Sequence, residues 1–82
     1  MKLIYTQHAL QRMSKRQLQA EWVENVAATP ARIEPDDYDD SLEHRLAVVP
    51  ELANRVLRVI VSKEEPRRVI SVYVDRTMKG KI

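Results

Sequence analysis

The amino-acid sequence predicts an α+β fold in which two N-terminal helices pack on one face of a three- to four-stranded antiparallel sheet. Apolar residues recur with helical spacing in the first third of the chain and then alternate with a period of two. The turns between the alternating segments are short, as in an antiparallel meander. At 82 residues the chain is expected to form a single domain, residues 1–82.

The first helix is expected to begin after Thr6, a good N-cap residue, and to end near Ser14. A period of 3.6 residues places three apolar side chains on the arc that should face the core. These are Ala9, Leu10 and Met13. The short segment Lys2–Tyr5 before this helix is a candidate edge strand.

A second helix is expected from about Gln19 to Ala28, because apolar residues again have helical spacing and Pro30 prevents the helix from continuing. Trp22 is the only tryptophan of the chain. We expect its side chain to anchor the core between the two helices, and stacking on a nucleic-acid base is the alternative.

Beyond the second helix the pattern changes to strands. Ala31–Glu34 is a short candidate strand, and Pro35–Ser41 is a polar, acidic loop. Three longer strands with alternating side chains follow, namely Leu42–Val49, Arg55–Ser62 and Arg68–Val74.

The alternation divides these strands into two faces. We expect the helices to cover the more apolar set, Leu46, Val48, Leu57, Val59, Val61, Ile70, Val72 and Val74. The uncovered face would then carry Arg45, Arg58, Ser71 and Tyr73 among Val49, Val56, Ile60 and Val69. An arginine between apolar neighbours on a central strand either serves a binding site or forms a structural ion pair, for Arg58 with Glu43 or Asp75.

The charges are unevenly distributed along the chain. The formal net charge is only +2, but six of the 12 acidic residues fall between Glu34 and Glu43. The rest of the chain has 14 basic against six acidic residues, a net charge of +8. A basic body suits an anionic partner such as RNA, and a solvated surface is the alternative. The acidic loop either masks the basic face or is solvated.

One histidine and two arginines are close together near the first helix. His8 and Arg12 are four residues apart, so they lie one above the other on the helix, and Arg16 follows just beyond its expected end. A ring that titrates near neutral pH beside fixed positive charges suits chemistry on phosphate esters. The ordinary alternative is a hydrogen-bonding histidine beside solvated arginines.

The run His8-Ala9, Arg12-Met13 and Arg16, followed by a second helix and a proline, resembles the small bacterial family catalogued as domain of unknown function 4258. Members of that family look like relatives of the RelE/ParE toxin and microbial ribonuclease superfamily, which has the same order of two helices and a meander. The residues that match are His8, Ala9, Arg12, Met13, Arg16, Arg58, Ser71 and Tyr73. Gln17 replaces the glycine that often follows the second arginine, so the turn before the second helix departs from the family pattern.

The resemblance implies a toxin-type, metal-independent ribonuclease or an RNA-binding protein, with a non-catalytic protein-interaction module of the same fold as the alternative. A ribonuclease of this kind lets the ribose 2′-hydroxyl attack its own phosphodiester, while the protein moves protons and stabilises charge. The candidate catalytic residues are His8, Arg12, Arg58 and Tyr73. The candidate RNA contacts are Arg12, Arg16, Arg45, Arg58 and Ser71. The expected partners are RNA and an acidic antitoxin or other protein.

Several classes of site are absent from the sequence. There is no cysteine, so thiol catalysis, cysteine zinc sites and disulfides are excluded. Gly80 is the only glycine, so no glycine-rich phosphate loop exists, and Asp36–Asp40 lacks the spacing of a calcium loop. We expect no metal and no cofactor. Neither a signal peptide nor an apolar run long enough for a membrane span is visible, so we expect a cytoplasmic protein without a membrane contact.

Overall fold

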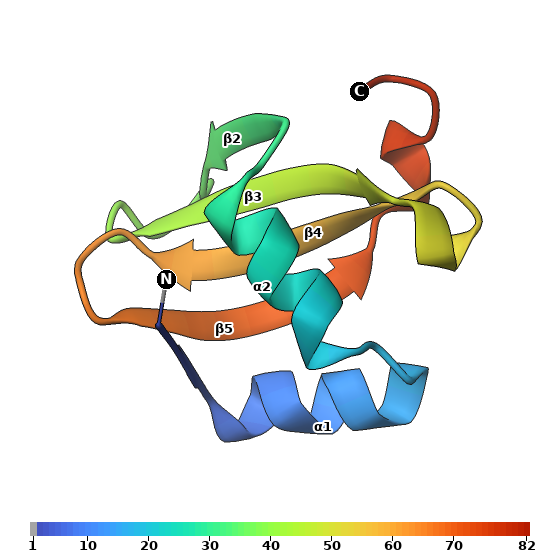
Figure 1. Ribbon diagram of the computed structural model, residues 1–82. Helices are drawn as coiled ribbons and strands as arrows, with labels where there is room; N and C mark the ends of the chain where they lie inside the picture. The colour runs from blue at the N-terminus through green and yellow to red at the C-terminus, as the bar shows by residue number, and fades with distance from the viewer. Residues whose placement is uncertain (1) are drawn as a thin grey trace.

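The computed structural model describes residues 2–82 and has five strands in one mixed sheet, with two helices on one side (Figure 1). The helices are α1 (Gln7–Arg16) and α2 (Ala20–Ala28). The strands are β1 (Leu3–Tyr5), β2 (Arg32–Pro35), β3 (Leu42–Val49), β4 (Arg55–Ser62) and β5 (Arg67–Val74). Two short 3-10 helices, η1 (Pro50–Leu52) and η2 (Arg76–Met78), follow β3 and β5. The α+β class is confirmed, whereas the expected three to four antiparallel strands understate the sheet.

The strand order is β1-β5-β4-β3-β2. The predicted meander of β3, β4 and β5 is antiparallel, and β2 adds an antiparallel edge beside β3. The other edge differs from the prediction, because β1 pairs with β5 in parallel, Tyr5 opposite Val69. A strand of three residues is too short for its alternation to reveal which partner it pairs with.

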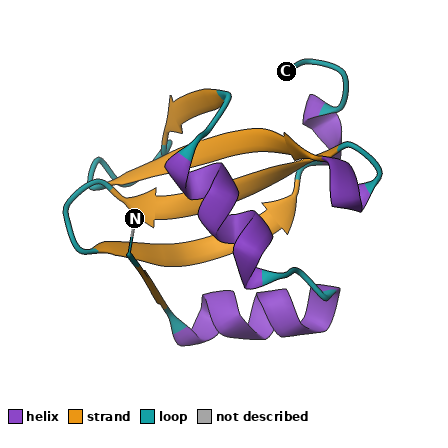
Figure 2. Cartoon of the chain, viewed as in Figure 1, coloured by secondary structure: helices purple, strands orange, loops and turns teal. Residues whose placement is uncertain are grey.

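The helices occupy different places on the sheet. α2 crosses the sheet face and contacts β3 and β4, whereas α1 lies along β5, which β1 pairs with only at its first residues (Figures 1 and 2). α1 therefore sits at the border of the sheet, where its outward side is free to line a surface site.

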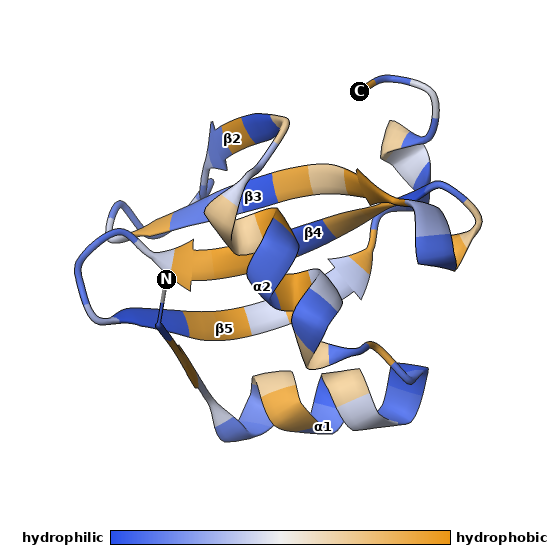
Figure 3. Ribbon diagram, viewed as in Figure 1, coloured by the Kyte–Doolittle hydropathy of each residue, from blue (hydrophilic) through white to orange (hydrophobic). Residues whose placement is uncertain are grey.

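The core lies between the helices and the meander, and Figure 3 shows apolar residues along β4 and on both helices. The buried cluster comprises Ala9, Met13, Leu18, Val23, Val26, Val49, Leu57, Val59, Val61, Val69 and Val72. Trp22 is half-buried and packs against this cluster, in agreement with its predicted role as a core residue. Burying a valine or leucine side chain contributes about 1.5–3 kcal/mol, so this cluster is the main source of stability.

The face assignment of β3 was wrong. Leu46 lies opposite Arg58, and Ala47 lies opposite Leu57, so Ala47 and Val49 face the helices while Leu46 and Val48 face away. Both alternate sets of β3 are apolar at this end, and a shift of one residue moves every side chain to the other face. The alternation alone therefore did not decide which set is covered.

A β-bulge in β5 accounts for a second difference between the predicted and the observed faces of the sheet. Ile60 lies opposite Ser71, but Val61 lies opposite Val69, so Ile70 is an extra residue on β5. The bulge turns Val69 towards the core, although Val69 was predicted on the uncovered face. Ser71 remains on the side away from the helices, as predicted, beside Ile60.

Hydrogen bonds define both ends of α1. The Thr6 side chain caps the helix by accepting a hydrogen bond from the Ala9 amide at 3.1 Å, as predicted. The helix is longer than expected and includes Arg16, and Leu10 is 48% exposed rather than part of the core. Gln17 has φ 55° and the Leu18 amide donates to the Met13 carbonyl, so glutamine forms the left-handed C-terminal turn in which glycine is common.

Candidate nucleic-acid interface

The border between α1 and β5 brings the sequence-predicted residues of both elements together. The Nε2 atom of His8 lies 3.3 Å from the hydroxyl oxygen of Ser71. Four residues of a helix advance about 6 Å, and two residues of a strand advance about 6.6 Å. Since α1 and β5 run in the same direction, Arg12 follows His8 along the helix as Tyr73 follows Ser71 along the strand. Helix α1 therefore reaches the sheet border that a shared site requires.

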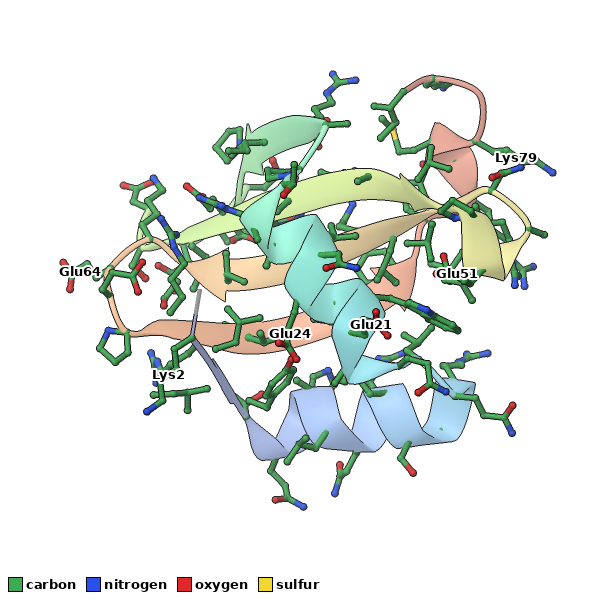
Figure 4. The ribbon with its side chains drawn as sticks, viewed as in Figure 1. Lys2, Glu21, Glu24, Glu51, Glu64 and Lys79 are labelled. Carbon is green, nitrogen blue, oxygen red and sulfur yellow. The ribbon has the colours of Figure 1, made fainter. Side chains whose placement is uncertain are left out.

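A cavity of about 570 Å³ continues this border towards the C-terminal end of α1. We call it the arginine pocket, and it is lined by Arg12, Arg16, Leu18, Leu52, Arg55, Tyr73, Val74 and Arg76. Its polar lining residues are four arginines and one tyrosine, and its apolar lining residues are leucine and valine. No acidic residue lines it, and α1 itself has none; the labelled Glu21 and Glu24 belong to α2 (Figure 4).

Pairing with carboxylates separates the nine arginines of the chain into two groups. Four of them form ion pairs with aspartate or glutamate, namely Arg32, Arg45, Arg58 and Arg67. In residues 2–82, no carboxylate pairs with any of the four arginines of the pocket. The pocket therefore concentrates positive charge that the protein does not neutralise itself, which is the property of an anion site.

Arg58 belongs to the paired group and lies outside the arginine pocket. Its side chain is 9% exposed and forms the ion pair that was the alternative. Nε and Nη2 both lie 2.8 Å from one oxygen of Asp75, and Nη1 donates to Glu34 at 3.0 Å. These contacts occupy the guanidinium, and Leu46 and Val56 around it are fully buried although they face away from the helices. η2 contacts β4 and contributes to covering this second face.

His44 connects Arg58 to the acidic loop. Arg58 can only donate, so Nδ1 of His44 accepts its hydrogen bond at 2.8 Å, and Nε2 of His44 donates to Asp36 at 2.7 Å. The Asp36 carboxylate also accepts from the amides of Tyr38 and Asp39. The hydrogen bond from His44, followed by that from the Tyr38 amide, lowers the pKa of Asp36 below its usual value.

Arg45 is also on the wrong face in the sequence prediction. It lies opposite Val59 on the helix side, where Nη1 donates to the Ala27 carbonyl at 2.6 Å and Nε pairs with Glu43. Ala27 is in the last turn of α2, which has no basic residue of its own. Arg45 therefore satisfies a helix C-terminal carbonyl and lies outside the pocket.

The acidic loop does not cover the arginine pocket. Leu42 pairs with Ser62 at one end of the sheet and Val49 pairs with Arg55 at the other, so the loop before β3 and the pocket lie at opposite ends. Instead, Glu34, Asp36 and Glu43 pair with residues of the sheet. Asp37 and Asp40 are exposed.

Two arginines of the pocket were not recognised from the sequence. Arg55 begins β4 and Arg76 follows β5. The antiparallel register that pairs Leu57 with Val74, continued by two residues, brings positions 55 and 76 together. This hairpin register was the available signal, but the sequence does not fix the register because of the bulge.

The described chain holds neither a cluster of metal-ligating side chains nor a helix that could span a membrane. In residues 2–82, no three histidine, aspartate or glutamate side chains are grouped so that they could hold a metal ion. Neither helix of the described chain combines the length and apolar character needed to cross a lipid bilayer.

Comparison with known proteins identifies the family. A family model described as a domain of unknown function (DUF4258) matches residues 5–74. The chain belongs to this family. The matched region contains α1, α2 and the complete meander, together with the border at His8 and Ser71. No curated protein and no solved structure matches the chain. The wider resemblance to the RelE/ParE superfamily therefore stays a prediction.

The first prediction separates the structural arginine from the pocket arginines. Arg58→Ala should destabilise the fold by about 3 kcal/mol, since it leaves a buried Asp75 unpaired. The matched change Arg16→Ala, at an exposed site, should cost less than about 0.5 kcal/mol. Urea unfolding of both variants tests this, and equal midpoints would contradict the assignment.

The stability difference between wild type and Arg58→Ala should also depend on pH. Burial alone would raise the pKa of Asp75, but hydrogen bonds from Thr77 and Arg58 outweigh it and lower that pKa. A lowered pKa means that the pair stabilises the fold above the unfolded value of about 4 and stops doing so as the pH falls through the folded value. The difference between wild type and Arg58→Ala should therefore shrink in acid.

Proposed function

We propose that the protein binds single-stranded RNA at the arginine pocket and along the α1–β5 border. The supporting observation is that four arginines without carboxylate partners in residues 2–82 line one cavity. Guanidinium groups bind phosphate oxygens with paired hydrogen bonds. The Tyr73 side chain, which is 36% exposed, offers an aromatic surface for a base.

Features of the border favour RNA over other anions. Single-stranded RNA presents unstacked bases and 2′-hydroxyls, which proteins recognise with aromatic rings and polar side chains. His8 and Ser71 supply polar groups one helical turn from Arg12, and Leu18 and Leu52 supply an apolar floor. A site with both characters accommodates a nucleotide better than it does an inorganic ion.

Metal-independent cleavage of the bound RNA is the second candidate function, and the contact of His8 with Ser71 favours it. In this reaction the ribose 2′-oxygen forms a bond to the adjacent phosphorus and the bond from phosphorus to the 5′-oxygen breaks. A proton leaves the 2′-hydroxyl and a proton reaches the 5′-oxygen, which gives a 2′,3′-cyclic phosphate and a 5′-hydroxyl. An imidazole can serve as acid or base near neutral pH.

The positions of the side chains support one assignment of roles in this mechanism. His8 transfers the proton, and Arg12, one turn along α1, holds the phosphate and stabilises its added charge in the transition state. Arg16 lies a further turn away and binds the strand in the pocket. Tyr73 lies on β5 beside Arg58 in the sheet register and could donate a proton. Arg58 has no direct role, because Asp75 and Glu34 occupy it.

The alternative of a protein-interaction module depended on an uncovered apolar sheet face. Val49 and Val69 of the expected set are in the core, and Val56 is fully buried. Much of the expected apolar set is therefore covered, while Val48 and Tyr73 stay exposed on this side of the sheet. An acidic protein segment, such as an antitoxin, would instead compete with RNA for the pocket arginines.

The second prediction concerns the salt dependence of RNA binding. Four arginine–phosphate contacts on a single strand give a slope of log K against log salt near −2.8, or about a 50-fold loss of affinity between 50 and 200 mM salt. The double variant Arg12→Ala with Arg16→Ala should reduce that loss to about sevenfold. Fluorescence anisotropy with labelled RNA measures both.

The matched control for this experiment is Arg68→Ala. Arg68 is exposed at the other end of β5 and lies outside the pocket, so its removal lowers the net charge by one and is matched by Arg12→Ala alone. The control should bind RNA nearly as wild type does. Equal weakening by both changes would reduce the site to general surface charge, and absence of binding at 50 mM salt would refute RNA binding.

The third prediction tests cleavage. His8→Ala should lower the cleavage rate by about 10² to 10⁴ while affinity for RNA hardly changes, because proton transfer acts in the transition state. Arg12→Ala should reduce both rate and affinity. Single-turnover cleavage and anisotropy on the same RNA separate the two effects. A folded His8→Ala protein that cleaves at the wild-type rate would leave binding as the only function.

A further inference from the structure

We infer that the arginine pocket holds a phosphorylated end of the RNA, and that internal phosphodiesters lie along the border beyond it. This inference rests on the proposed RNA binding and specifies which part of the strand occupies the pocket. The ligand group is a terminal phosphomonoester or polyphosphate. It enters from either the 5′ or the 3′ end, and the experiment below distinguishes the two.

The charge in the pocket exceeds what one internal phosphate requires. An internal phosphodiester carries one negative charge and two free oxygens, whereas a terminal phosphate carries about −1.5 to −2 at pH 7 and three acceptor oxygens. Four arginines line a cavity of about 570 Å³, which is the size of a small-molecule site rather than of an extended groove. A terminal phosphate or polyphosphate matches this density of donors.

The four arginines come from different directions. Arg12 and Arg16 project from α1, whereas Arg55 and Arg76 come from the β4 and β5 ends of the neighbouring hairpin. An internal phosphate must leave room for the chain on both sides, but a terminal phosphate needs it on one side only. Donors that reach one cavity from two separate elements therefore suit an end.

Arg55 is already oriented for this role. Its Nε donates to the Leu52 carbonyl at 2.9 Å, and the side chain is half-buried. This contact fixes the plane of the guanidinium before any ligand arrives, so less rotamer freedom is lost on binding. Arg55 is the pocket arginine that a backbone carbonyl holds in place.

The predicted site residues outside the pocket lie along α1 and β5. From Arg16, the basic and polar side chains continue along α1 through Arg12 to His8, beside Tyr73 and Ser71 on β5. A strand anchored by its end in the pocket would run along this line. Tyr73 would stack the terminal base, and the next phosphates would pass the imidazole of His8.

The test compares one short RNA sequence with different ends. Labelled RNAs with a 5′-hydroxyl, a 5′-monophosphate, a 5′-triphosphate or a 3′-phosphate are titrated into the full chain by fluorescence anisotropy. At least one phosphorylated end should bind about tenfold more tightly than the matched hydroxyl, because each charged oxygen gains a charge-assisted hydrogen bond. Comparison of the four RNAs identifies which end of the strand the pocket binds and how many phosphates it accepts.

Arg55→Ala and Arg76→Ala should bring this ratio close to one, and Arg68→Ala should leave it unchanged. Equal affinity for all ends, with RNA still bound, would overturn end recognition but not RNA binding. Failure of every RNA to bind would overturn both. Competition by free adenosine monophosphate as strong as that by the 5′-phosphorylated RNA would show that the pocket takes a nucleotide and would also overturn end recognition.

Discussion

The position of α1 depends on the hydrogen bonds of one residue, Thr6. Its amide donates to the Val69 carbonyl at 3.1 Å and its hydroxyl donates to the Ile70 carbonyl at 3.2 Å. The same hydroxyl oxygen accepts from the Ala9 amide and so starts the helix. Thr6 thereby joins the first turn of α1 to the bulge of β5. Because the helix begins at this fixed point and runs with the strand, His8 reaches Ser71 and the following arginines line the sheet border.

Ion pairing then decides which arginines are available to a ligand. The sheet arginines are neutralised by carboxylates from β2, β3 and the residue after β5, and they hold the second face and the end of α2 together. A buried, paired guanidinium such as that of Arg58 cannot leave its partners without exposing a charge to an apolar surrounding. The pocket arginines have no such partners in the described chain. The acidic cluster of the sequence therefore stabilises the sheet and leaves the α1 border basic.

The sequence predicted the elements better than it predicted their faces. Strong local signals, such as the Thr6 cap and the alternation of β3 and β4, were sufficient for both helices and the meander. The faces depended on register, which was ambiguous where Leu46 and Ala47 are both apolar and where Ile70 is an extra residue. The site residues, too, were predicted where the signal is local and missed where it depends on strand pairing. His8, Arg12 and Arg16 are neighbours on one helix and were found, whereas Arg55 and Arg76 meet only through tertiary pairing.

We propose that the arginines without carboxylate partners at the α1–β5 border and in the pocket form the binding site. Nuclear magnetic resonance of the arginine Nε–Hε groups, recorded while single-stranded RNA is added, tests it most directly. We expect the signals of four residues to shift with a common affinity, namely Arg12, Arg16, Arg55 and Arg76. The signals of Arg45 and Arg58 should remain in place. Shifts confined to Arg45, Arg58 or other residues outside the pocket would contradict it.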